Sequence, residues 1–189
     1  TLSIVMPIAC SDAQFASVLS ALFAWNTRFL ERVPSEFIIL DSVPNPGIEG
    51  KVARLQTLAA DLDVAIMLIE TTTVGSGAKF AEGLRHAAGI YSLFLTDEVL
   101  PIYDVLTDVL DLAERGYFSS LTFIHTEHPE GASHPLRYPR HAPVMAVSFG
   151  VARTEIYRRL VVNIPAHAFG TLHWCLGCWN IGLRPAYST

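Results

Sequence analysis

The chain has 189 residues, of which 51% are hydrophobic and 16% are charged, and its formal net charge is −5. A chain of this length can bury the core of one domain without disulfides, and the negative charge argues against nucleic acid as the main partner. No run reaches the ~18–20 apolar residues that span a bilayer, and three cysteines make no disulfide framework, so we expect a cytoplasmic protein.

Strand and helix patterns alternate along the first part of the chain. Short apolar runs rich in β-branched residues predict buried strands, and apolar residues at helical spacing predict the helices that cover them. Ser11 or Asp12 is expected to cap the first helix and Gly89 to end the third. The predicted strands are Leu2–Ile8, Glu36–Leu40, Val64–Ile69 and Ile90–Leu95, and the helices have apolar faces within Phe15–Phe23, Glu49–Leu62, Ala78–Ala88 and Ile102–Leu110.

This order predicts an α/β fold with a mainly parallel central sheet and helices on both faces, within a single domain over 1–189. The pattern loosens after Gly116, where we expect strands at Ser119–Thr126 and Val144–Gly150 and helices at Arg153–Leu160 and Leu172–Ile181. Ligands of such sheets lie at the carboxyl ends of the strands. That rule places four segments on one edge: Ala9–Asp12, Asp41–Ser42, Thr71–Gly77 and Thr96–Glu98.

Acidic residues follow two of these strands. Asp41 ends the run FIILD, where a carboxylate can accept hydrogen bonds from a nucleobase or ribose, or can bond the nearby backbone and end the strand. Asp97 and Glu98 follow IYSLFL, and carboxylate oxygens there suit Mg²⁺ or Mn²⁺ shared with substrate phosphates. Equally, they can cap the next helix, where their charge complements its dipole.

Two further motifs are weaker. VGSGAKFAEG fails as a dinucleotide fingerprint because Phe80 stands where a glycine is needed, although Gly75 and Gly77 could let backbone N–H groups approach a phosphate. Cys175 and Cys178, with His173 nearby, make only half of a zinc site. We therefore interpret both cysteines as packing residues of a helix.

With these residues placed, the chain resembles the family 2 glycosyltransferases of the GT-A fold, a Rossmann-like three-layer sandwich. LSIVMPIACSDAQFASVLSAL is similar to that family's opening strand and helix, and EFIILDS to its second strand. GSGAKFAEGLRHAAGIYSLFLTDEVLP resembles its glycine loop, helix, strand and D-x-D motif. HWCLGCWNIGLRPAY resembles its W-C-L-R helix, so the likeness covers nearly the whole chain.

The resemblance implies sugar transfer from a nucleotide diphosphosugar to a hydroxyl of a glycan, lipid or protein acceptor, with a Mg or Mn ion. It implies a nucleotide-sugar-binding half at 1–115 and an acceptor-side half at 116–189. The nucleotide-binding residues would be Pro7, Ala9, Asp41, Gly75 and Gly77. Asp97, with Glu98 beside it, would bind the metal, and a carboxylate would normally act as general base.

The chain departs from the family pattern at several chemical positions. Leu95 stands where the first Asp of D-x-D is expected, and Gly170 and Thr171 replace the usual Glu-Asp pair, which leaves His173 as candidate base. An alternative is therefore a catalytically inactive GT-A-like domain that binds a nucleotide sugar or a protein. The high apolar content fits a doubly covered sheet, and equally a surface for a membrane, a protein partner or a second copy.

Overall fold

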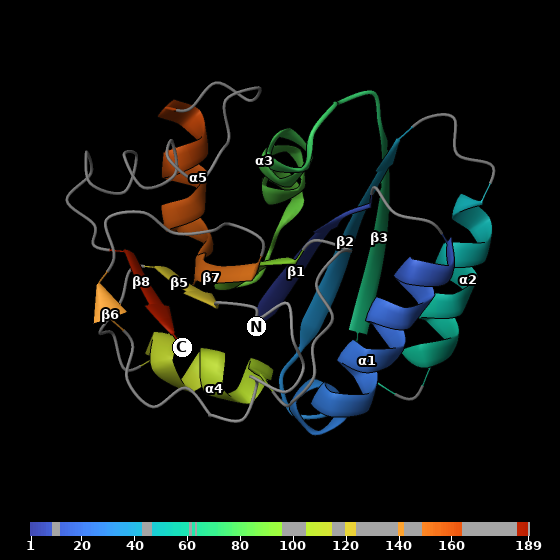
Figure 1. Cartoon of the computed structure of the whole chain (residues 1–189), viewed down its shortest axis with the longest axis horizontal. Coiled ribbons are helices and arrows are strands. Elements are labelled where there is room, and N and C mark those ends of the chain that lie inside the picture. Colours follow the sequence, from blue (N-terminus) through green and yellow to red (C-terminus); the bar gives the residue numbers. More distant parts are fainter. Residues whose placement is uncertain are drawn as a thin grey trace.

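The computed structural model describes residues 1–8, 12–42, 47–60, 62, 64–95, 105–114, 120–123, 140–141, 149–163 and 185–188. Within them the strands form one eight-stranded sheet of order β3-β2-β1-β4-β7-β5-β8-β6 (Figure 1). Its strands are β1 Leu2–Pro7, β2 Ser35–Ser42, β3 Val64–Thr71, β4 Tyr91–Leu95, β5 Ser120–Phe123, β6 Arg140–His141, β7 Phe149–Arg153 and β8 Pro185–Ser188.

The sheet is parallel from β3 to β4 and mixed beyond it. β1 pairs in parallel with both β2 and β4, and β2 pairs in parallel with β3. β7 runs antiparallel to β4 and β5, whereas β5 and β8 are parallel and β6 is antiparallel to β8. The predicted α/β class with a mainly parallel sheet is therefore confirmed, and the antiparallel pairings lie in the second part of the chain.

Helices cover both faces of this sheet. They are α1 Asp12–Leu30, α2 Ile48–Leu58, α3 Ser76–His86, α4 Val105–Glu114 and α5 Thr154–Asn163. α1 contacts α2 and α4 on one face, and α3 contacts α5 on the other. The helices of β1–α1–β2 and β2–α2–β3 thus lie on one face of the sheet, and the helix of β3–α3–β4 lies on the opposite face. From β1 the chain adds β2 and then β3 on one side, and it then returns to add β4 on the other side of β1. The winding direction therefore changes between β1 and β4.

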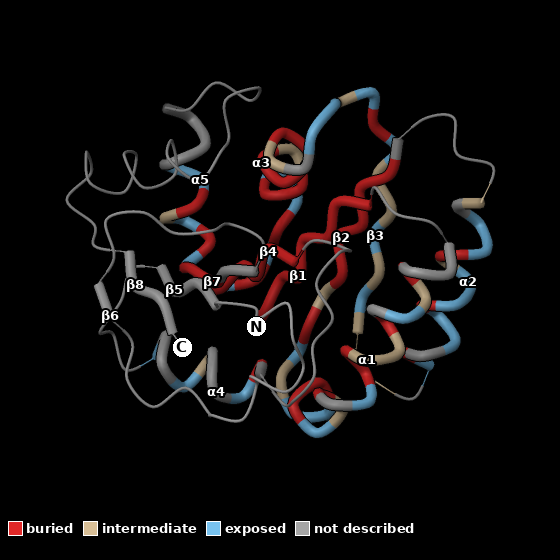
Figure 2. Tube along the Cα trace, in the orientation of Figure 1, coloured by how far each residue is buried: buried red, intermediate tan, exposed pale blue. Residues whose placement is uncertain are grey.

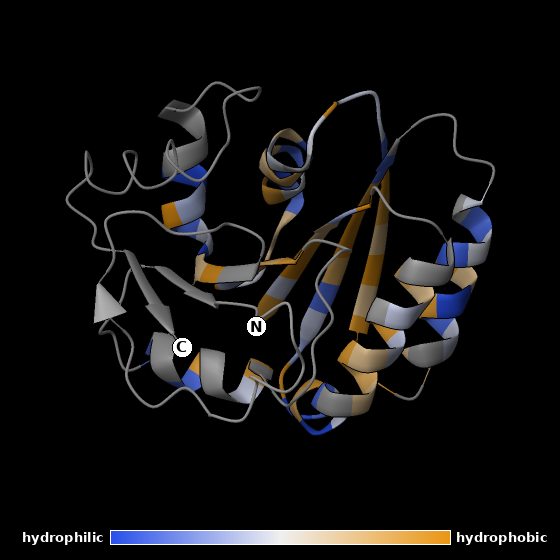
Figure 3. Cartoon of the chain, viewed as in Figure 1, coloured by the Kyte–Doolittle hydropathy of each residue, from blue (hydrophilic) through white to orange (hydrophobic). Residues whose placement is uncertain are grey.

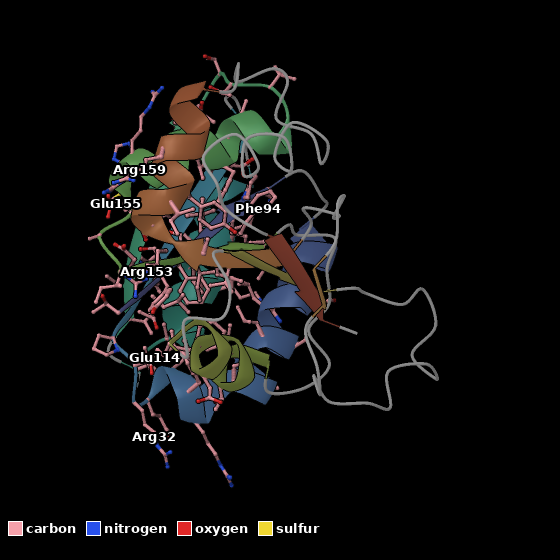
Figure 4. The ribbon with its side chains drawn as sticks, turned by 90° about the vertical axis from the view of Figure 1, so that its left-hand side faces the viewer. Arg32, Phe94, Glu114, Arg153, Glu155 and Arg159 are labelled. Atoms are coloured by element: carbon pink, nitrogen blue, oxygen red, sulfur yellow. The ribbon has the colours of Figure 1, made fainter. Side chains whose placement is uncertain are left out.

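The central strands are buried on both faces, which explains their unbroken apolar sequences. Along β1, Ile4 and Met6 belong to the core under α1, whereas Val5 between them belongs to the core under α3. Figure 2 shows this burial through the middle of the sheet, and Figure 3 shows the hydrophobic colouring of β1, β2 and β3. Phe80 of α3 stacks obliquely on Phe94 of β4 at 4.2 Å between ring centroids, and Figure 4 labels Phe94 beside α3 and α5.

Glycine allows α3 to lie close to the sheet. A Cβ atom added at Gly83 would stand 2.5 Å from Val5 Cγ1 and 2.8 Å from Leu40 Cδ1, so no larger residue fits the present arrangement. α3 crosses β1 and β2 at this point. The close approach brings the first turns of α3 over the carboxyl ends of those strands, a boundary that we call the carboxyl edge.

Buried Asn26 sets the position of α4 on the other face. Its Nδ2 donates to the Leu22 carbonyl at 2.9 Å within α1, and its Oδ1 accepts the Leu106 N–H at 3.0 Å in the first turn of α4. Since the first N–H groups of a helix have no partner inside it, this amide acts as a cap supplied from a neighbouring helix. The Asn26 amide therefore fixes the start of α4 against α1.

Several predicted boundaries need correction. α2 ends at Leu58 and not at Leu62, because Ala60 N–H bonds the Thr57 carbonyl and the chain tightens into a turn. α3 begins and ends two residues before the predicted Ala78–Ala88. Gly89 is not its left-handed cap: among described residues only Gly75 has a positive φ, and Gly89 instead lies against the backbone of β1.

The second part of the chain was predicted less well. β5 falls inside the predicted Ser119–Thr126, and α5 begins one residue after the predicted Arg153. β7 lies later than the predicted Val144–Gly150, and β6 and β8 were not predicted. The predicted helix Leu172–Ile181 lies outside the described residues, and the single-domain division at 115/116 stays a prediction. No helix of the described residues is long and apolar enough to span a bilayer.

Candidate functional site

The candidate site lies at the carboxyl edge, where β1 to β4 all end because they are parallel. In doubly wound sheets, ligands bind in the crevice where the winding direction changes. Here the winding direction changes between β1 and β4, and β1 ends at Pro7, which is buried and aligned with Leu40 of β2. Of the predicted edge residues, the structure places Pro7, Asp41, Gly75 and Gly77 on this side. Ala9, Asp97, Glu98 and His173 lie outside the described residues.

Asp41 is buried within an ion pair. Its carboxylate Oδ2 lies 3.4 Å from the Nζ of Lys51 in α2, and the two side chains are each 3% exposed. The Lys51 ammonium also lies 5.8 Å from the centre of the Phe15 ring of α1. Asp41 was predicted as a strand-end acid, and its buried lysine partner was not. A buried carboxylate held in this way is oriented, and it lies at the end of β2.

A second buried lysine reaches the same edge from the opposite face. Lys79 of α3 is 5% exposed, and its Nζ donates to the main-chain carbonyl of Ile8 at 2.9 Å. Ile8 directly follows β1, and its own N–H bonds the Leu40 carbonyl at 2.9 Å, next to Asp41. The Lys79 ammonium therefore stands at the end of the central strand, at the change of winding direction.

A carboxylate and two threonines hold the loop between β3 and α3. Glu82 Oε2 accepts the Thr71 hydroxyl at 2.6 Å and the Thr73 hydroxyl at 2.8 Å, and Thr73 N–H donates to Thr71 Oγ1 at 3.0 Å. This clamp leads into Gly75, whose φ of 92° is a conformation that favours glycine. Gly75 precedes α3 without a side-chain cap, and Gly77 lies in its first turn and not in the predicted loop.

We expect the Glu82 clamp to depend on pH. The Thr71 hydrogen bond is the largest cause that lowers the pKa of Glu82 from its ordinary 4.5, aided by Thr73, Arg85 and His86 and opposed by burial. A lowered folded-state pKa stabilises the protein above the unfolded-state value, and this stabilisation disappears as pH falls through the folded-state value. Glu82→Gln should therefore lower the free energy of unfolding by about 1 kcal/mol near pH 7.

The measurement is urea unfolding of both proteins between pH 7 and pH 3. Their difference in free energy of unfolding should shrink steadily below the ordinary pKa of 4.5, because the wild-type carboxyl then protonates as well. A difference that stays constant over this range would show that ionised Glu82 does not hold the loop.

The described residues contain no group of three or more His, Cys, Asp or Glu side chains that could hold a metal ion. At the carboxyl edge, the Asp41 carboxylate is already paired with the Lys51 ammonium. The described residues thus do not fit a divalent cation. Asp97 and Glu98, which carry the metal prediction, lie outside them.

Lys51, Lys79 and Glu82 are the residues that sequence reasoning missed. A signal was present for both lysines. Lys51 lies four residues before buried Leu55, and Lys79 precedes buried Phe80 and lies four residues before Gly83, so each falls on the inward face of its helix. A lysine on an inward face is uncommon because its charge must be compensated.

Comparison with known proteins places the fold but no family. No family model matches the chain, and no curated protein matches it significantly. Among solved structures, the mannosyltransferase PcManGT of Pyrobaculum calidifontis in complex with GDP-Man and Mn²⁺ is similar, with a TM-score of 0.74 and 17% identity over 97% of this chain and 53% of that one. S. aureus TarS 1–349 in complex with UDP-GlcNAc has a TM-score of 0.73 and 14% identity over 99% of this chain and 55% of that one.

At 17% and 14% sequence identity, the similarity to these two structures shows a shared fold. The chain has the Rossmann-like α/β fold of structures that include glycosyltransferases, and it spans about half the length of the two proteins named.

Proposed function

We propose that the chain is a glycosyltransferase-like domain that binds a nucleotide diphosphosugar at the carboxyl edge and transfers its sugar to an acceptor hydroxyl. One observation carries the proposal: the buried lysine and carboxylate side chains of the described residues, Asp41, Lys51 and Lys79, all lie at the carboxyl edge, the edge at which sheets of this kind bind ligands. Burying a charged side chain in a core is unfavourable. Binding a polar ligand is a function that would explain why these charged side chains are buried here. The fold shared with nucleotide-sugar complexes supports the same reading.

In this proposal Asp41 accepts a hydrogen bond from the nucleobase or ribose. Lys51 keeps that carboxylate ionised and oriented. Pro7, the last residue of β1, and Ala9, two residues later in the sequence, are proposed to border the nucleoside. Gly75 and Gly77 bring the backbone of the first turn of α3 toward the diphosphate, where its N–H groups favour negative charge.

Asp97, with Glu98 beside it, is proposed as the ligand of a Mg²⁺ or Mn²⁺ ion, which when bound would neutralise the leaving diphosphate. The Mn²⁺ in the PcManGT complex supports a divalent ion as part of this proposal. His173 is the proposed base that takes the proton of an acceptor hydroxyl on a glycan, lipid or protein. We keep as proposals the family 2 assignment, the acceptor-side half at 116–189, the cytoplasmic location, and contact with a membrane surface, a protein or a second copy.

A second candidate is a catalytically inactive domain of the same fold that binds a nucleotide sugar or a protein. It is favoured by Leu95 in the place of the first D-x-D acid and by Gly170 and Thr171 in the place of the Glu-Asp pair. Nucleotide binding and turnover separate the two. An inactive domain would bind the donor and leave its sugar attached.

The test is thermal unfolding with UDP, GDP, UDP-GlcNAc or GDP-Man, each with and without Mn²⁺. A ligand at ~100 times its dissociation constant adds ~2.7 kcal/mol to the free energy of unfolding, so at least one nucleotide should raise the melting temperature clearly. Asp97→Ala should abolish any extra stabilisation by Mn²⁺ while leaving the metal-free shift. A full panel without any shift would remove the proposed function.

A further inference from the structure

The two edges of the described sheet differ in character. β6 is the last strand on one side, and it has only two residues, Arg140–His141. A strand so short and polar gives another chain little to pair with. β3 is the last strand on the other side, and its sequence, VAIMLIET, contains no proline, glycine, lysine or arginine that would hinder an added strand. Among the described strands β2 is its only partner, so the outer N–H and C=O groups of β3 are available to an added strand.

A row of apolar side chains accompanies this open edge on the face that carries α3. Met67 is aligned with Ile38 of β2, which belongs to the core under α3. Because side chains alternate along a strand, Ala65 and Ile69 share the face of Met67. α3 contacts β1 and β2, whereas Ala65 is exposed and Met67 is 40% exposed. Figure 2 shows this change from the buried middle of the sheet to β3.

We propose that β3 is a dimerisation strand, which pairs antiparallel with β3 of a second copy of this chain about a twofold axis at Met67. The inference is independent of nucleotide binding. Only alternate residues of β3 direct their N–H and C=O groups outward, so a symmetric pair must be centred on a residue and not between two. With Met67 opposite Met67, Ala65 lies opposite Ile69 and Ile66 lies opposite Leu68. The central cross-strand pairs are therefore apolar on both faces of the joined sheet.

The charge pattern of β3 favours a second copy as the occupant. Glu70 is the one charged residue of the strand, and this register places it opposite Val64. The two Glu70 carboxylates then stand six residues apart along the ladder, or ~20 Å, which exceeds the Debye length at physiological salt. Pairing also uses the open edge of both copies, so the assembly closes at two. An extended segment of a different protein is the alternative occupant, and it predicts a monomer in the purified protein.

The size of the contact indicates a weak, reversible dimer. A ladder over residues 64–70 is ~24 Å long, and a sheet with its side chains is ~10 Å thick. The ladder thus covers roughly 240 Å² on each copy, compared with about 800 Å² for a stable interface. We therefore expect association at high protein concentration, and the measurements must reach that range.

The first experiment is sedimentation of the purified protein over about a hundredfold range of concentration up to ~500 μM, as a weak interface requires. The wild type should show a monomer–dimer equilibrium. Met67→Lys should weaken dimerisation by about a hundredfold, because it places two ammonium groups opposite each other at the twofold axis. Val74→Lys is the matched control: it adds the same charge at an apolar residue that is 88% exposed in the turn after β3, outside the ladder, and should leave the equilibrium unchanged.

A cross-link tests the register without a charged variant, and it decides the matter if Met67→Lys does not fold. Met67→Cys should form an intermolecular disulfide on mild oxidation, because directly opposite residues of an antiparallel pair have the Cα separation that a disulfide spans. Ala65→Cys is the control on the same face. Its counterpart in the second copy lies four residues along the ladder, or ~14 Å away, so it should stay unbridged. The wild type gives the background from its own cysteines, Cys10, Cys175 and Cys178.

Three results would overturn the inference. The first is a wild-type protein that remains monomeric at every concentration, which would leave the edge to a different partner. The second is a dimer that Met67→Lys does not weaken. The third is equal bridging by Met67→Cys and Ala65→Cys, which would mean collision of copies and not pairing about Met67. None of these measurements involves a nucleotide, so the proposed function and this interface can fail separately.

Discussion

Lys51→Met should lower the free energy of unfolding by about 3–5 kcal/mol, the cost of removing one partner of a buried ion pair. Methionine keeps an unbranched apolar stem of similar length. What it removes is the ammonium 3.4 Å from Asp41 Oδ2, and it leaves that carboxylate in a site where both side chains are 3% exposed. Urea unfolding at pH 7 measures the loss.

The double variant Asp41→Leu with Lys51→Met should recover most of this loss, because replacing both partners of a buried pair by apolar groups is often neutral. Arg159→Met is the matched control. Its ion pair with Glu155 spans one turn of α5 with side chains 69% and 74% exposed, on the outer surface shown in Figure 4. Such pairs contribute less than about 1 kcal/mol. If Lys51→Met cost no more than Arg159→Met, the pair would not be buried in solution as described.

The first four strands and the helices between them could be predicted because hydrophobic periodicity decides them. Phe15, Leu19 and Leu22 repeat at helical spacing, and all three are fully buried against the sheet. Unbroken apolar runs marked the strands that are covered on both faces. Four such units in alternation leave few topologies open, and the parallel order β3-β2-β1-β4 is one of them.

The second half was predictable only in part, because its pairings join segments that are far apart in the chain. β4 pairs with β7 across more than fifty residues, and β8, near the carboxyl end, inserts between β5 and β6. A two-residue strand such as Arg140–His141 has no periodicity to detect. Its pairing is set by the neighbouring strand and not by its own sequence.

The candidate site, too, could be predicted from the sequence only in part. Asp41 could be predicted because it ends an apolar strand, whereas its partner Lys51 could not, since helical spacing shows which face a residue shares but not what lies opposite. Lys79 follows the same logic, because its contact with Ile8 joins residues 71 positions apart. Asp97, Glu98 and His173 stay predictions of the resemblance.

The site also shows why fold and activity are separate questions here. The carboxyl edge is assembled from β1, β2, α2 and α3, all within the part of the chain that periodicity predicts best. The residues that would supply metal and base lie outside this part. A working transferase and a binding domain therefore share the described core, and only ligand experiments separate them.

Gly89→Ala should destabilise the protein by about 3 kcal/mol, at the upper end of overpacking effects. A Cβ atom there would stand 2.6 Å from both the N and Oγ atoms of Ser3 and 2.9 Å from the carbonyl carbon of Leu2, and backbone atoms of a central strand cannot move aside. The N–H of Gly89 also donates to Ser3 Oγ at 2.8 Å and to Glu36 Oε1 at 3.2 Å, so displacing it disturbs a shared network.

Gly50→Ala is the control, because it makes the same substitution in α2 with nothing within 4 Å of the added atom. It should raise the free energy of unfolding by about 0.5–1 kcal/mol, since alanine is the better helix former. Urea unfolding of the two variants should give changes of opposite sign, because β1 lies against the turn before β4. A tolerated alanine at position 89 would mean that this turn stands further from β1, and it would also put in question the pairing of β1 with β4 that follows the turn.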